Sequence, residues 1–325
     1  MGREFSKMGV EFVGKYAFVF PGQSSQYVGM GKDLYEEYEI ARSTFHEANT
    51  ALGFNLAELC FHGPEERLKE TLNTQPAIVG VSIALFRVLT FFGLKPYVVA
   101  GHSLGEYSAL VAAESITFDE AIRLVRERGR FMEEACPIGQ GAMAAVLGLD
   151  LKRVEEACKS GQEHGVVDIA NFNSSGQIVI SGNRNAIEEA AEHALKLGAK
   201  RCVMLQVSGA FHSQLMKPAA QRLEVKLTQI EIKDPVTPFI SNVSADYVTT
   251  GAAVKESLVK QVFSPVRWEN SVQRMINDGI ELFVEVGPGN VLSGLIKRIS
   301  KNAKVFNVQD SDDLKKVLEI LKEAG

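Results

Sequence analysis

Residues 98–109 contain a short serine motif that limits the fold more than any other part of the sequence. A β-branched run ending at Ala100 leads into Gly101-His102-Ser103-Leu104-Gly105, and a helical pattern of apolar residues follows. A serine between a strand and a helix, flanked by glycines that let the two elements approach closely, is typical of a nucleophile elbow. The N-terminus of the following helix also offers unpaired backbone N–H groups to an oxyanion. We therefore predict that Ser103 is a nucleophile.

Strands and helices alternate on both sides of this motif. The pattern predicts strands over residues 16–20, 97–100, 237–240 and 281–286. Predicted helices cover 31–50, 64–71, 75–92, the stretch from the motif to 114, 118–134, 214–229, 254–261, 268–277 and a last one beginning near Asn290. Such alternation favours the α/β class, with a mainly parallel sheet covered by helices.

The pattern changes between residues 137 and 207. Strands are predicted over 143–149, 166–171, 177–181 and 202–207, with helices over 151–159 and 185–197. This β-α-β-β-α-β order is that of a ferredoxin-like unit. We predict that 137–207 form a small ferredoxin-like subdomain, inserted into a large α/β catalytic domain made of 1–136 and 208–325.

Composition excludes several classes of function. The chain has 325 residues, 46% hydrophobic and 23% charged, with a net charge of −5, which fits a globular protein with a large core. It has no dense basic run, so we expect no nucleic-acid partner. The apolar segment 76–94 is interrupted by Ser82, Arg87 and Thr90, so we expect a buried helix and no membrane span.

Cysteine and N-terminal patterns indicate a cytoplasmic protein. The four cysteines have no C-x-x-C spacing, and the histidines lack metal-ligand spacing, so we expect neither disulfides nor a metal. The first fifteen residues include Glu4, Lys7, Glu11 and Lys15, which leave no apolar core for a signal peptide.

A serine hydroxyl needs a base to become a good nucleophile. His212 is the best candidate, because it lies in a predicted loop between a strand and a helix, beside small residues. His102 adjoins Ser103, and neighbours in a tight turn usually point apart. The residues leave a third triad member open: Asp168 and several glutamates lie between Ser103 and His212 in the chain, but none stands at an obvious strand end.

Arg128 occupies a position that helical spacing assigns to the protein interior. On the predicted helix 118–134 the apolar face contains Leu124, Val125, position 128 and Met132. A buried guanidinium needs an anion, because an unpaired buried charge is costly. The anion is either an internal carboxylate or a carboxylate of the substrate, which the planar fork of arginine matches well.

Two further segments at the ends of predicted strands are candidates for the same site. Pro21-Gly22-Gln23 either presents a backbone N–H to an oxyanion or simply reverses the chain. The amides of Asn171 and Asn173, in the segment that joins two subdomain strands, either face a cleft or make local turns.

Taken together, the motifs resemble the malonyl-CoA:acyl carrier protein transacylases of type II fatty acid synthesis. The resemblance covers nearly the whole chain. Its motifs are Phe18-Val19-Phe20-Pro21-Gly22-Gln23, Thr74-Gln75-Pro76-Ala77, the segment 101–109, Arg128-Gly129 with Met132, Gly141-Ala142-Met143, Asn171-Phe172-Asn173, Phe211-His212 and Glu285-Val286-Gly287-Pro288-Gly289.

The resemblance implies a Ser–His dyad in place of a triad. Ser103 would be the acylated nucleophile, His212 its base, and the backbone carbonyl of Gln261 the group that orients the histidine. The backbone N–H groups of Gln23 and Leu104 would form the oxyanion hole.

The resemblance also implies how the substrate is bound. Arg128 would pair with the free carboxylate of a malonyl group, and Gln75, Asn171 and Asn173 would line the cleft. Malonyl-CoA would be the donor, holo acyl carrier protein the partner, and no tightly bound cofactor would be needed.

Two positions depart from the family pattern. Ser24 stands where the family usually has glycine, and Gly209-Ala210-Phe211 precedes His212 where many bacterial members differ. The Ala-Phe-His form is similar to that of malonyl-selective polyketide synthase acyltransferases, and a bulky Phe211 would leave little room for an α-methyl branch. Three alternatives remain: a trans-acting polyketide acyltransferase, a serine thioesterase or hydrolase that uses the same elbow with water as acceptor, and an acyltransferase-like domain that only docks carrier proteins.

Overall fold

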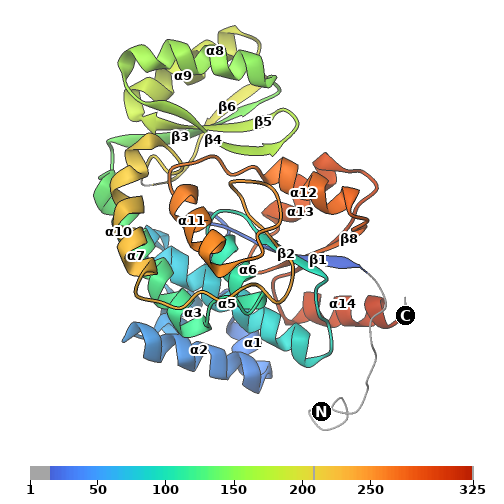
Figure 1. Ribbon diagram of the computed structural model, residues 1–325. Coiled ribbons are helices and arrows are strands. Elements are labelled where there is room, and N and C mark those ends of the chain that lie inside the picture. Colours follow the sequence, from blue (N-terminus) through green and yellow to red (C-terminus); the bar gives the residue numbers. More distant parts are fainter. Residues whose placement is uncertain (1–14, 208, 324–325) are drawn as a thin grey trace.

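Two β-sheets organise the protein, and their strands pair in different directions (Figure 1). The computed structural model describes residues 15–207 and 209–323. The larger sheet is parallel and has the order β7-β2-β1-β8-β9. Its strands are β1 (Tyr16–Phe20), β2 (Val98–Gly101), β7 (Phe239–Ile240), β8 (Leu282–Val286) and β9 (Lys304–Val308).

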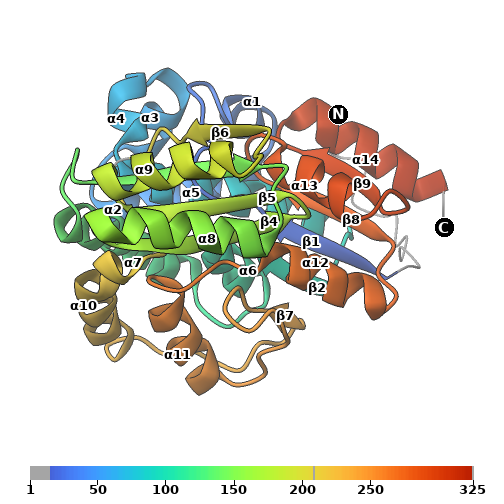
Figure 2. The ribbon, with the colours of Figure 1, turned by 90° about the horizontal axis from the view of Figure 1, so that it is seen from above.

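The smaller sheet is antiparallel and has the order β4-β5-β3-β6. Its strands are β3 (Gly141–Leu147), β4 (Val167–Ser174), β5 (Gln177–Asn183) and β6 (Arg201–Met204). Helices α8 (Leu151–Gly161) and α9 (Arg184–Lys196) cover the face of this sheet that lies away from the larger sheet (Figures 1 and 2). The predicted β-α-β-β-α-β order of elements is confirmed, and so is the mixed α/β class.

The remaining helices surround the parallel sheet. They are α1 (Lys32–Glu37), α2 (Glu39–Leu52), α3 (Leu56–His62), α4 (Glu65–Lys69), α5 (Thr71–Phe91), α6 (Gly105–Ala112), α7 (Phe118–Ala135), α10 (Lys217–Leu227), α11 (Gly251–Gln261), α12 (Trp268–Asn277), α13 (Val291–Ile299) and α14 (Ser311–Glu323). Two short 3₁₀ helices lie at Gln162–His164 and Gln214–Met216.

The parallel sheet is buried on both faces, as parallel sheets usually are. Along β1, the side chains of Phe18 and Phe20 join the large core that contains α5. Ala17 and Val19 point the other way, into a second core that contains Trp268 of α12. Strand alternation therefore holds one helical layer on each face, and the strand ends remain as the edge where loops can form a site.

The carboxyl ends of three neighbouring strands bring distant segments together. Phe20 pairs with Gly101, and Ala100 pairs with Ile240, so β1, β2 and β7 end at nearly the same level. The segments that follow these strands begin at Pro21, His102 and Ser241.

Several predicted boundaries were wrong. The helix expected over 31–50 is two helices, because Tyr38 is extended at φ −121° and ψ 120°. The helix expected over 75–92 begins earlier, at Thr71, so that Pro76 lies in its second turn, and the helix expected over 64–71 is the shorter α4. Helix α3 was not predicted, although the side chain of Asn55 caps it by accepting the backbone N–H of Glu58. Strand β9 and helix α14 were not predicted either.

Helix α5 is the one helix in the described part of the chain that is long and apolar enough to cross a membrane. However, 78% of its most apolar stretch is buried within the protein, which is the pattern of a core helix. The four cysteines form no disulfide, as expected. The expected lack of an apolar leader concerns residues 1–14, which lie outside the described residues.

The close approach of β2 to α6 generates the first prediction. A Cβ added to Gly101 would lie 1.9 Å from the carbonyl carbon of Gly105, whereas one added to Gly294 in α13 would meet no atom within 4 Å. We expect Gly101→Ala to lower the free energy of unfolding by about 3 kcal/mol or more, because backbone atoms would have to separate. Gly294→Ala should raise it by about 0.5–1 kcal/mol, because alanine favours the helix. Urea unfolding of both variants measures this; equal effects would contradict the packing described here.

Candidate active site

Ser103 lies on a sharp turn between β2 and α6. Its φ is +51°, in the left-handed region that non-glycine residues seldom adopt. A Cβ at Gly105 would lie 2.0 Å from the backbone oxygen of Phe20, so only glycine lets α6 approach β1 at this point. The turn presents the serine hydroxyl beyond the strand end, as the motif predicts.

The backbone of this turn is held by Asn242, which follows β7. The Ser103 N–H donates to the Asn242 side-chain oxygen at 2.7 Å. The Asn242 amide donates in turn to the Gly101 carbonyl at 2.6 Å. The strained conformation of Ser103 is therefore maintained from a neighbouring strand.

His212 meets Ser103 from a loop 109 residues further along the chain. Its Nε2 lies 2.7 Å from Ser103 Oγ, and its Nδ1 lies 2.8 Å from the Gln261 carbonyl oxygen. Because a carbonyl only accepts, Nδ1 carries the proton and Nε2 presents its lone pair to the hydroxyl. Burial, followed by the neighbouring Arg128 charge, lowers the pKa of His212 to about 3. The ring is therefore a neutral imidazole, the form that can accept a proton from serine.

The histidine makes no hydrogen bond to a carboxylate in the described part of the chain. The Asp168 carboxylate, left open as a third triad member, accepts the backbone N–H of Gln214 at 2.8 Å. The position beside Nδ1 is taken by the Gln261 carbonyl, as the resemblance implies.

Arg128 is buried on α7 and points at the same hydroxyl. Its Nη1 donates to the Gln75 side-chain oxygen at 2.9 Å, and its Nη2 donates to the Gln261 side-chain oxygen at 3.0 Å. Nη2 also lies 3.3 Å from Ser103 Oγ. Arg128 forms no salt bridge with any carboxylate of residues 15–207 or 209–323, and its buried Nε has no partner there. The sequence left two possible anions for Arg128, and the first of them, an internal carboxylate in direct contact with the guanidinium, is not observed among these residues.

Two backbone N–H groups, one in the turn after β1 and one directly before α6, are candidates for an oxyanion hole. Within the described residues, those of Gln23 and Leu104 make no hydrogen bond to the protein. Leu104 is the residue directly before α6, and Gln23 lies in the turn after β1, with its side chain donating to Thr71 Oγ1 at 3.2 Å. Both N–H groups are therefore available to donate hydrogen bonds to an oxyanion.

The other predicted residues lie at differing distances from this centre. The Asn173 side-chain oxygen accepts a hydrogen bond from His102 Nε2 at 2.9 Å, so Asn173 contacts the residue before the serine. Asn171 is buried on β4 and pairs through its backbone with Val266, and no hydrogen bond joins its side chain to the serine within the described structure. Phe211 is buried next to His212, with its ring against Gly209.

Sequence reasoning missed two buried residues of this site, Asn242 and Glu106. Glu106 lies in the first turn of α6 and is fully buried. Most of the residues after it in α6 are apolar, so a lone glutamate there was a signal of a buried carboxylate. Asn242 had no such signal, because the asparagine lies in an ordinary polar segment after a two-residue strand.

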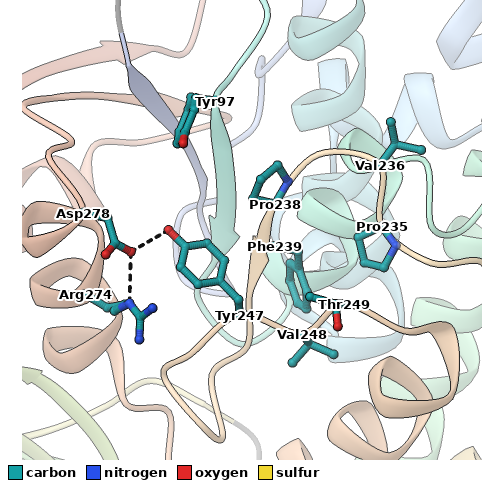
Figure 3. Close-up of a pocket in the computed structure, with 10 residues that line it drawn as sticks. All are labelled: Tyr97, Pro235, Val236, Pro238, Phe239, Tyr247, Val248, Thr249, Arg274 and Asp278. Carbon is teal, nitrogen blue, oxygen red and sulfur yellow. Dashed lines mark hydrogen bonds and ion pairs between the residues drawn. The ribbon is translucent and has the colours of Figure 1, made fainter.

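A groove of about 400 Å³ opens onto His212. It lies between the small sheet and the loops that carry the histidine, and its lining includes Phe172, Phe263, Arg267 and Lys159. A larger hollow of about 550 Å³ is lined by Tyr97, Tyr247 and Arg274, near the start of β2 (Figure 3). That hollow therefore lies away from the serine, which follows the opposite end of β2. No group of His, Cys, Asp and Glu in the described residues is placed to hold a metal ion.

A serine on a strand–helix turn, paired with a neutral histidine, defines a protein built for acyl transfer through serine. The family model of the acyl transferase domain matches residues 17–316. The malonyl CoA-acyl carrier protein transacylase of Bacillus subtilis is 48% identical over 310 residues, which are 95% of this chain and 98% of the relative. The chain therefore belongs to the malonyl CoA-acyl carrier protein transacylase family, and the resemblance predicted from its motifs is confirmed.

Solved structures agree with this assignment. An acyl carrier protein S-malonyltransferase from Vibrio cholerae has a TM-score of 0.91 and 46% identity, covering 94% of this chain and all of its own. A malonyl-transacylase solved in complex with a holo type II PKS acyl-carrier protein has a TM-score of 0.92 and 44% identity over the same share of this chain and 100% of its own.

The burial of neutral His212 predicts a pH-dependent stability. Its folded pKa lies below the ordinary value of 6.5, so below that pH the unfolded state binds a proton that the folded state does not. Stability should therefore fall as the pH drops. Between about pH 7.5 and pH 5.5, we expect the free energy of unfolding of the unmodified protein to fall by about 1 kcal/mol more than that of His212→Gln. Urea unfolding at both pH values measures this, and an identical fall would mean that folded His212 protonates freely.

Proposed function

We propose that this protein transfers the malonyl group of malonyl-CoA to the phosphopantetheine thiol of acyl carrier protein, through a malonyl ester on Ser103, and so supplies malonyl units for fatty acid synthesis. The observation that carries the proposal is that a base and a cation meet at one hydroxyl oxygen. Ser103 Oγ lies 2.7 Å from His212 Nε2 and 3.3 Å from Arg128 Nη2. A base and an unpaired cation at one serine suit an acyl donor that carries a free carboxylate.

In the first half-reaction, Ser103 Oγ attacks the thioester carbonyl while His212 Nε2 takes the hydroxyl proton. The Gln261 carbonyl on Nδ1 stabilises the imidazolium that forms. The N–H groups of Gln23 and Leu104 bind the oxyanion of the tetrahedral intermediate. Its collapse breaks the carbon–sulfur bond, and His212 returns the proton to the departing CoA thiolate.

In the second half-reaction, the carrier thiol gives its proton to His212 and attacks the malonyl ester. The carbon–oxygen bond to Ser103 breaks, and His212 reprotonates the serine. Arg128 holds the distal malonyl carboxylate through both steps, so the acyl carbonyl stays oriented while the two thiols exchange. Gln75 fixes the guanidinium by accepting from Nη1 at 2.9 Å. The scheme needs only the two substrates and no cofactor. The expected cytoplasmic location stays a prediction.

We further propose the domain division predicted from the sequence, with 137–207 as a small unit inserted in a catalytic unit of 1–136 and 208–325. Asn171 and Asn173 would then line the cleft from the small unit. The contact between Asn173 and His102 at 2.9 Å supports this, because it joins β4 to the residue before the nucleophile. Phe211, buried beside His212, would restrict the space at the acyl α-carbon.

Ser103→Ala should abolish transfer, because the variant lacks the atom that carries the acyl group. Incubation with malonyl-CoA followed by intact mass measurement should show a malonyl adduct on the unmodified protein and none on the variant. Adding holo carrier protein should discharge the adduct much faster than buffer alone. An adduct on the variant would exclude Ser103 as the nucleophile, and discharge at the same rate in buffer would indicate a hydrolase.

Arg128→Ala should weaken malonyl-CoA as a donor far more than acetyl-CoA, since acetyl has no distal carboxylate. The loss of a buried charge-assisted pair leads us to expect a fall of about 10²-fold or more in kcat/KM for malonyl-CoA. Competition between the two donors, read by intact mass, gives the ratio directly. Equal losses for both donors would assign Arg128 to structure alone.

A further inference from the structure

Glu106 is the fully buried carboxylate closest in sequence to the nucleophile, and the mechanism above does not use it. It lies in the first turn of α6, three residues after Ser103. A buried carboxylate is costly unless hydrogen bonds satisfy it, so its partners show what it supports.

Both carboxyl oxygens of Glu106 accept N–H groups. Oε1 accepts the backbone N–H of Asn242 at 2.7 Å, and Oε2 accepts the side-chain amide of Gln261. Burial raises the pKa of Glu106 to about 7, while the two N–H donors and the Arg128 charge act in the opposite direction. Because both oxygens of Glu106 accept a hydrogen bond and neither donates one, these contacts favour the ionised carboxylate.

Gln261 connects this carboxylate to the base and the cation. Its side-chain Nε2 donates to Glu106 and, at 2.8 Å, to the Ser103 carbonyl. Its side-chain oxygen is thereby turned to Arg128 Nη2, 3.0 Å away. Its backbone oxygen accepts His212 Nδ1. If the amide were reversed, its N–H groups would face the guanidinium, which has no acceptor, so Glu106 fixes the orientation of the amide.

Asn242 connects the same carboxylate to the nucleophile. The Asn242 backbone is held by Glu106, and its side chain bonds both Ser103 N–H and the Gly101 carbonyl. One carboxylate thus reaches Ser103, His212 and Arg128, each through a single intervening residue.

We propose that Glu106 is a positioning residue for acyl transfer, which holds Arg128 and His212 through Gln261 and the Ser103 turn through Asn242. The inference rests on the proposed function, because the geometry it maintains is that of malonyl transfer. Glu106 touches no reacting atom. Its removal should therefore change how well malonyl is placed relative to acetyl, and a purely structural residue would leave that preference intact.

The test is Glu106→Gln. A glutamine offers one acceptor and one donor where two N–H groups point, so it loses either the Asn242 or the Gln261 contact. Misplacement of a reacting group by about 1 Å costs on the order of 10²-fold in rate, and we expect a fall of this size in single-turnover malonylation of Ser103. The ratio of kcat/KM for malonyl-CoA to that for acetyl-CoA should fall by about tenfold, because acetyl does not use Arg128.

Glu285→Gln is the matched control. Glu285 is also fully buried, and its carboxylate accepts the backbone N–H groups of Leu292 and Ser293 at 3.0 and 2.7 Å. It lies on β8, its carboxylate binds the first turn of α13, and it makes none of the contacts described above. Its substitution should cost similar stability in urea unfolding, while the malonyl-to-acetyl ratio stays at that of the unmodified protein.

The outcomes are distinguishable. If the unmodified protein forms no malonyl adduct, the proposed function fails. If it does, and Glu106→Gln matches Glu285→Gln in rate and donor ratio, the role of Glu106 is overturned. Should Glu106→Gln not fold, Gln261→Met serves instead, because it removes the amide and keeps the backbone carbonyl on His212. The donor ratio must then fall by about tenfold, and an unchanged ratio also overturns the proposal.

Discussion

The site depends on one buried cation that is solvated by neutral groups. Arg128 is 2% exposed, and the side-chain oxygens of Gln75 and Gln261 are its closest acceptors. Amide oxygens orient a guanidinium without a contact ion pair, and the nearby carboxylate of Glu106 is separated from Arg128 by the Gln261 amide, so the guanidinium can still pair directly with a substrate carboxylate. Because Arg128 is buried, bulk water does not screen this charge. An acyl group that brings its own carboxylate is the partner that such a site lacks.

The same cation also affects the state of the base. Burial is the main cause that lowers the pKa of His212, and the positive charge of Arg128 adds to it, so the imidazole remains neutral well below the usual titration range. The strength of His212 as a base therefore depends in part on whether a carboxylate is bound to Arg128. Once a carboxylate neutralises the guanidinium, the imidazolium becomes easier to form, because the repulsion is removed. Binding of a dicarboxylic acyl group would thus also prepare the base that activates the serine.

The sequence predicted those parts of the site whose chemistry leaves a local pattern. Ser103 lies in a motif between a strand and a helix, and Arg128 interrupts an apolar helical face, so both were found from spacing. The partner of His212 Nδ1 was not, because a backbone carbonyl has no residue-type signal, and it came only from the family resemblance. Asn242 was missed since its contacts join segments 139 residues apart. In the fold, the break at Tyr38 was invisible because neither glycine nor proline marks it.

The absence of a carboxylate on His212 within the described structure follows from the position of Arg128. A third triad acid at Nδ1 would lie close to the guanidinium, because Gln261 contacts the imidazole with its backbone and the arginine with its side chain. Two opposite charges so near in a dry site would form an internal ion pair, and the substrate carboxylate would have to displace it. A carbonyl orients the imidazole without that competition. The nearby acid, Glu106, is instead separated from Arg128 by the Gln261 amide, which lets a carboxylate order the site and leaves the cation available to the substrate.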